Sequence, residues 1–199
     1  MKEESLEMFV SKLYDMNKRT VECLDLLQSA FIHNSLKSLD ASESKAKETH
    51  QTEKSLTQEL IEKLKNNPDA FVYVSVPGHL ERVGDYLEDI IGCLRTKVKD
   101  GILFSDRAIS EVTFLMQKIQ EVLKNIGDII MTRNVVLGTY VKESQTEISK
   151  SANGFATMHE ERLIEGLCTP RASSLFLDII DAAKGIAWHT KKIAEKLTT

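Results

Sequence analysis

The sequence predicts an all-α protein, because residues that break helices are rare and apolar residues recur at helical spacing along nearly the whole chain. The 199 residues include only three prolines and nine glycines, which favours a few long helices. The clearest pattern alternates steps of three and four residues without a miss, as expected for one continuous buried seam on a helix. Its members are Ile109, Val112, Met116, Ile119, Leu123, Ile126 and Ile130.

The first two helices are predicted between the N-terminus and residues 66–68. The first has a wide core face, formed by Leu6, Phe9, Leu13, Met16, Thr20, Cys23 and Leu27 with Val10, Val21, Leu24 and Phe31. The second should begin near Asp40, where D-A-S-E offers a carboxylate cap, and stop at Asn66-Asn67-Pro68. Residues 42–54 carry almost no apolar face, so this part is expected to project or to pack loosely.

A third helix should follow a short lead-in. Residues 72–76 resemble a strand in isolation, but they precede Pro77-Gly78 and the chain offers no partner strand, which favours a helical or irregular segment. The helix should end near Lys99-Asp100-Gly101, where basic residues precede a glycine. Its predicted core face contains Leu80, Val83, Leu87, Ile90 and Leu94.

Capping signals mark the last three helices. Ser105 or Asp106 can cap the fourth by accepting from unpaired backbone N–H groups, and Phe104 precedes the cap where a staple contact would lie. The fifth, at about residues 134–166, has a thinner apolar line through Val141, Ile148, Ala152 and Phe155, and Gly154 weakens it. Thr169-Pro170 begins the sixth. Its seam is Phe176, Ile179, Ala183, Ile186, Thr190, Ile193 and Leu197.

Six helices in two runs of three predict two antiparallel three-helix bundles joined side by side. The first would occupy residues 1–102 and the second residues 103–199. A single elongated six-helix bundle is the alternative arrangement.

The composition excludes several classes of function. The formal net charge is −4 and the basic residues are scattered, so nucleic acid is not an expected partner. No apolar run approaches the ~18 residues of a membrane span, and the N-terminal M-K-E-E-S is charged, which predicts a cytoplasmic protein, peripheral to a membrane at most. Cys23, Cys93 and Cys168 are far apart in apolar surroundings and are expected to be buried free thiols.

The motif content argues against an enzyme. A ferritin-like di-iron site needs Glu-x-x-His pairs, and none of the five histidines has a glutamate three residues before it. No phosphate-binding glycine loop, G-x-S-x-G or Cys/His nucleophile arrangement is present. His159 and His189 have no second ligand at helical spacing, so surface or capping roles are expected, and Trp188 is expected to pack at an interface.

Two segments resemble the PhoU family. G-H-L-E-R-V-G-D-Y-L-E-D-I, residues 78–90, is similar to the helix-three signature of that family, which contains an L-E-R-I-G-D core. H-E-E-R-L-I-E-G-L-C-T-P-R-A-S-S-L-F-L-D, residues 159–178, resembles the matching stretch of PhoU-like domains attached to sodium/phosphate cotransporters. The resemblance covers nearly the whole chain as a duplicated three-helix unit and is weakest over residues 1–60.

The resemblance implies a candidate metal site in the first half. Family members carry E/D-x-x-x-D motifs on the second and third helices of each half, and in some members these hold multinuclear metal clusters. Carboxylates four apart lie one above the other on a helix, where they suit hard or borderline cations such as iron or zinc. The third-helix candidates are Glu81, Asp85, Glu88 and Asp89. The matching second-helix positions are His50 and Lys54, where carboxylates would be expected.

In the second half the earlier of the two helices keeps its carboxylates and the later one lacks them. Glu143 and Glu147 keep the spacing on the fifth helix, whereas the sixth-helix positions are Lys184 and Trp188. A lysine ammonium neutralises carboxylates much as a metal cation would.

We therefore expect Lys54 to face Glu81/Asp85, and Lys184 to face Glu143/Glu147, as ion pairs that replace metal. The alternative is that Glu48 or Glu53 restores an acidic partner, with His50 as a nitrogen ligand.

The function implied by the resemblance is regulation of phosphate transport. The protein would act as an adaptor that docks onto a membrane phosphate transporter or its sensor kinase, alone or as a homodimer. A metal-binding protein holding iron, zinc or nickel is a second hypothesis. A structural helical dimer with no connection to phosphate is a third.

Overall fold

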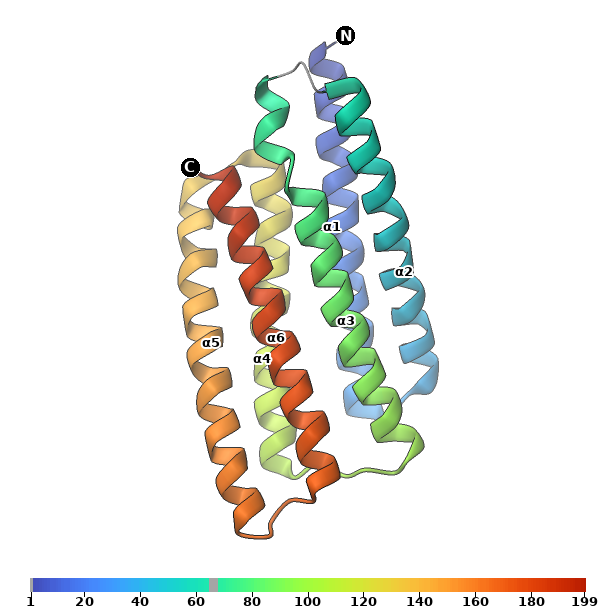
Figure 1. The fold of residues 1–199 in the computed structure, drawn as a ribbon, viewed down its shortest axis with the longest axis vertical. Helices are drawn as coiled ribbons and strands as arrows, with labels where there is room; N and C mark the ends of the chain where they lie inside the picture. The colour runs from blue at the N-terminus through green and yellow to red at the C-terminus, as the bar shows by residue number, and fades with distance from the viewer. Residues whose placement is uncertain (1, 65–67) are drawn as a thin grey trace.

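The computed structural model describes residues 2–64 and 68–199, and the chain forms an elongated bundle of long α-helices (Figure 1). The helices are α1 (Lys2–His33), α2 (Leu36–Glu59), α3 (Val76–Lys99), α4 (Asp106–Thr132), α5 (Val135–Ile164) and α6 (Pro170–Leu197). A π-helical turn, Leu60–Leu64, extends α2, and a 3-10 helix, Pro68–Tyr73, leads into α3. The prediction that residues 72–76 form a helical or irregular lead-in and not a strand is thus confirmed. The predicted end of the second helix at Asn66-Asn67 lies outside the described residues.

The six helices form two sets of three that share one core. Within α1–α3 and within α4–α6 every helix packs against both others, and the sets join where α1 packs on α4 and α3 packs on α6. Helices α2 and α5 lie on opposite outer sides (Figure 1). One hydrophobic cluster includes residues from all six helices. The division of the chain into repeats at residue 102 stays a prediction.

The predicted seams largely form the core. Every seam residue predicted for α3 and α6 is buried, including Leu80, Phe176 and Leu197. One member of the α4 seam is wrong, because Ile109 is 39% exposed. It lies in the first turn of α4, on the side of the helix away from the buried Ala108 and Glu111. Phe104 packs edge-on against Phe31 and Phe176, with ring centroids 6.1 and 6.3 Å away.

The caps explain where the helices begin. Ser105 rather than Asp106 caps α4, since its hydroxyl accepts from Ala108 N at 3.3 Å. Thr169 caps α6 as predicted. The predicted start of α2 near Asp40 is wrong: Ser35 caps it by accepting from Ser38 N at 3.2 Å, one turn earlier. A short polar side chain with extended backbone is sufficient for this cap, and no acidic partner is needed.

The expectation that residues 42–54 project or pack loosely is also wrong. This half of α2 packs against both α1 and α3 through small side chains, and Ser42, Ala46 and Thr49 are buried. The Ser42 hydroxyl donates to the Cys23 carbonyl at 3.0 Å, which satisfies it inside the core. A face of small residues buries little apolar area but lets two helices approach closely.

A polar network ties the lower ends of α4, α5 and α6 together. Arg162 donates two bonds to the buried Glu111 carboxylate, at 3.1 and 2.8 Å. His159 is buried, stacks on Phe176 at 4.2 Å and shares a hydrogen bond of 2.9 Å with the Ser173 hydroxyl. The surface or capping role expected for His159 is therefore wrong.

The three cysteines are free, as expected, but only Cys23 is fully buried, while Cys93 and Cys168 are partly exposed. Within the described ranges, no helix combines the length and the apolar character that a membrane crossing requires.

Two glycines give a matched test of the α3–α6 contact. A Cβ at Gly185 of α6 would overlap the Tyr86 ring of α3, whereas a Cβ at Gly154 of α5 meets nothing within 4 Å. We expect Gly185→Ala to lower the free energy of unfolding by about 1–3 kcal/mol because Tyr86 must leave its place. Gly154→Ala should raise it by about 1 kcal/mol through helix propensity alone. Urea unfolding followed by Trp188 fluorescence measures both, and equal effects of the two variants would contradict the close approach.

Candidate functional site

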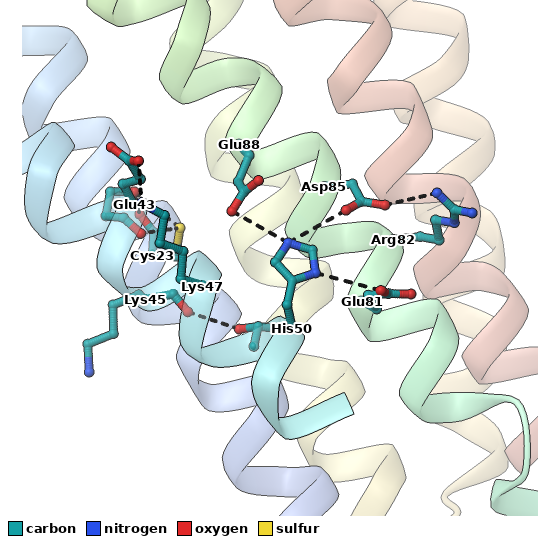
Figure 2. A network of polar contacts seen from close by, with 11 residues as sticks. Cys23, Glu43, Lys45, Lys47, His50, Glu81, Arg82, Asp85 and Glu88 are labelled. Carbon is teal, nitrogen blue, oxygen red and sulfur yellow. Dashed lines mark hydrogen bonds and ion pairs between the residues drawn. The ribbon is translucent and has the colours of Figure 1, made fainter. Parts of the chain in front are cut away.

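The acidic stripe of α3 faces a single histidine of α2. Glu81, Asp85 and Glu88 are spaced four and three residues apart, so they lie on one side of α3. His50 reaches across from α2 into this row (Figure 2). Its Nδ1 lies 3.7 Å from a Glu81 oxygen, and its Nε2 lies 3.6 Å from Asp85 and 3.5 Å from Glu88. The imidazole is thus surrounded on three sides by carboxylates.

Gly84 of α3 lies opposite Thr49 and His50 of α2. A Cβ at Gly84 would lie 3.6 Å from Thr49 Cγ2 and 3.8 Å from His50 Cε1, which is ordinary van der Waals distance, so an alanine would fit at this position. Thr49 and His50 therefore face α3 beside the row of carboxylates.

The residue opposite the α3 acids is His50, and Lys54 does not take the place expected for it. Lys54 is exposed one helical turn further along α2. Asp85 also accepts from Arg82 Nη1 at 3.0 Å, which supplies a positive group at the edge of the cluster (Figure 2). Asp89 lies apart from His50 and lines a groove between α3 and α6.

The expected ion pairs of the second half are wrong. Lys184 pairs with Asp181 of its own helix at 3.2 Å, and Glu147 pairs with Lys118 of α4 at 3.3 Å. Glu143 is exposed. The reason is the register of α5 and α6: it is Lys191 that meets α5, donating to Gln145 Oε1 at 3.1 Å. Glu143 and Glu147 are therefore not matched by Lys184 and Trp188.

Trp188 instead belongs to an aromatic cluster between α3 and α6. His79 of α3 and His189 of α6 place their Nδ1 atoms 2.9 Å apart, within hydrogen-bond distance. Trp188 packs edge-on against both imidazoles, with centroids 6.2 and 4.7 Å away. The interface role expected for Trp188 is confirmed, whereas His189 is a partner of His79 rather than a surface residue. Sequence spacing gave no signal for this pair, because its members are 110 positions apart.

Both imidazoles are held in their neutral form. Burial, with the neighbouring His79 and Arg82 adding to it, lowers the pKa of His189 from 6.5 to about 4, against an opposing contribution from Asp85. Burial and Lys192 lower the pKa of His79. One proton shared between the two Nδ1 atoms is therefore the stable arrangement. A second proton would add a positive charge beside the first hydrogen-bonded imidazole and weaken the contact between α3 and α6.

Among residues 2–64 and 68–199, no three or more histidine, cysteine or carboxylate side chains are placed so that they could hold a metal ion. In the His50 cluster the imidazole nitrogens lie 3.5–3.7 Å from the carboxylate oxygens.

The fold places this chain among the PhoU-type helical bundles. The structure of PhoU from Pseudomonas aeruginosa superposes with a TM-score of 0.91 at 16% identity, covering 99% of this chain and 97% of that one. The phosphate transport system regulatory protein PhoU from Streptococcus pneumoniae superposes with a TM-score of 0.87 at 12% identity, covering 99% and 95%. At these identities the likeness is one of fold. No protein-family model and no curated protein matches the sequence.

The neutral histidine pair makes stability depend on pH. Since the folded pKa of His189 is below its unfolded value of 6.5, the unfolded chain binds more protons. Stability should therefore be fully present above pH 6.5 and fall as the pH drops toward 4. We expect a loss of about 2 kcal/mol, which His189→Gln reduces. Chemical unfolding at a series of pH values measures it. His33→Gln, which removes an exposed imidazole, is the control, and an unchanged slope in His189→Gln contradicts the assignment.

Proposed function

We propose that this protein is a cytoplasmic regulator of phosphate transport that acts by docking onto a membrane phosphate transporter or its sensor kinase and not by catalysis. The observation that supports it is the superposition on two PhoU structures over 99% of the chain, since one of them is a phosphate transport system regulatory protein. The acidic motif of α3, which resembles the PhoU signature, folds into a solvent-accessible face with His50 at its centre.

A rigid helical bundle suits this role. Most of its polar side chains lie on long helix faces, and binding to such a face requires little rearrangement of the backbone. The α3 face combines negative charge with contacts to His50, 3.6 Å from Asp85, and to Arg82, which donates to Asp85 at 3.0 Å. Charge complementarity across such a face directs partner choice and association rate.

The docking proposal predicts a loss of partner binding when the charge of the α3 face is reversed. We expect the wild-type protein to co-purify with a membrane transporter or sensor kinase, and Glu81→Lys/Asp85→Lys to lose that partner and to alter phosphate uptake. Glu160→Lys/Glu161→Lys, an equal reversal at two exposed positions of α5, should keep both. Affinity capture and phosphate uptake in a deletion strain measure this. Unchanged uptake in the deletion strain would favour a structural helical protein unrelated to phosphate.

A metal-binding function is a second candidate, supported by the single imidazole that three carboxylates surround. Small rotations of Glu81, Asp85 and Glu88 would bring oxygen ligands to a cation beside His50, the mixed nitrogen and oxygen set that suits iron, zinc or nickel. Elemental analysis of protein purified without chelator tests it. Stoichiometric metal that disappears in His50→Ala supports this function, and protein without metal after incubation with each ion excludes it.

A further inference from the structure

A groove of about 690 Å³ runs between α3 and α6, below the aromatic cluster. Its floor includes the small residues Gly92, Cys93 and Ala182, together with Thr96 and Leu175. A Cβ at Gly92 would meet nothing within 4 Å, so the groove is open above this residue. Tyr86, which packs over Gly185, closes its upper end.

The rims of the groove are acidic on both sides. Glu88 and Asp89 project from α3, and Asp178 and Asp181 project from α6, while no basic side chain lines the groove. Lys184 neutralises Asp181 at 3.2 Å, and His50 contacts Glu88 at 3.5 Å. Within the part of the chain that the structure describes, Asp89 and Asp178 have no cationic side chain within ion-pair distance. The groove therefore carries uncompensated negative charge.

The Cys93 thiol on the floor of the groove lies within the electrostatic influence of both carboxylates. Burial raises the pKa of the Cys93 thiol to about 11, and Asp178 and Asp89 raise it further by opposing a second negative charge. Both carboxylates therefore act on the same point between the helices, although they come from different helices.

The shape of the groove favours side chains with an apolar stem and a cationic end. Lysine and arginine lay their methylene stems along apolar surface and keep the charged group in a polar rim. The small floor residues leave room for such stems, and Asp178 and Asp181, one helical turn apart, offer successive acceptors. A row of carboxylates along two rims matches several cations in sequence better than one compact ion.

We infer that this groove binds a lysine- and arginine-rich peptide segment of the protein partner. The inference rests on the proposed docking function and identifies its contact surface. The cytoplasmic segments of membrane proteins are enriched in lysine and arginine, which is the charge that the groove lacks.

Peptide binding to the purified full-length protein tests the inference. The probe is a fluorescein-labelled nonapeptide of alternating lysine and serine, followed by anisotropy. We expect Asp89→Asn/Asp178→Asn to weaken binding at least about tenfold. Glu160→Gln/Glu161→Gln, an equal loss of charge on α5, should leave it unchanged. Equal weakening by both variants would overturn the inference, because binding would then follow net charge alone. Displacement by spermidine as effective as by the unlabelled peptide would also overturn it in favour of a small polycation.

The alkylation rate of the Cys93 thiol measures whether the groove is occupied. In a Cys168→Ser background Cys93 is the accessible thiol, since Cys23 is fully buried. Bound peptide should slow its alkylation about tenfold by covering the groove floor, and an unchanged rate would contradict binding in the groove.

The deletion strain separates this inference from the proposed function. If the wild-type gene restores regulated phosphate uptake and Asp89→Asn/Asp178→Asn does not, the groove is the docking surface. If both restore it, the groove inference fails while the proposed function stands. If deletion leaves phosphate uptake unchanged, the proposed function fails, whatever the peptide measurements give.

Discussion

The close approach of α3 and α6 is the constraint on which the rest of the structure depends. Tyr86 rests on the backbone of Gly185, and no side chain larger than hydrogen fits at that position without displacing the ring. This contact is part of the α3–α6 packing that, with α1 against α4, joins the two sets of three helices. The histidine pair lies above it and the acidic groove below it, so one glycine sets the geometry of both.

The packing of α2 against α3 determines the surroundings of the acidic stripe. From α2, His50 reaches three carboxylates of α3 at once. The carboxylates are 36–38% exposed, so solvent screens these contacts and each contributes little to folding stability. The three carboxylates and the imidazole are therefore a solvent-accessible polar face of α3 more than a stabilising contact between helices.

The sequence predicts the helices well because each depends on local information. Thr169 and Ser105 identify helix starts through their own side chains, and the α6 seam identifies its buried face. Contacts between helices depend on register, which periodicity does not specify. Periodicity therefore predicts that Lys184 faces α5, whereas Lys191 is the residue that bonds to it. The close packing of the first half of α2 is not predicted for a related reason. Its buried face is made of serine, alanine and threonine, and a search for apolar periodicity does not detect such a face.

The acidic stripe and the groove share one carboxylate. Glu88 contacts His50 on the α2 side and also lines the groove on the α6 side. It can do both because residues 88 and 89 lie about 100° apart around α3, so the acidic surface continues from one side of the helix to the other. A cation held in the groove would attract Glu88 away from His50 and leave the imidazole with Glu81 and Asp85. The two sites share a single side chain, so a partner bound in the groove would also change the surroundings of His50 at the centre of the α3 motif.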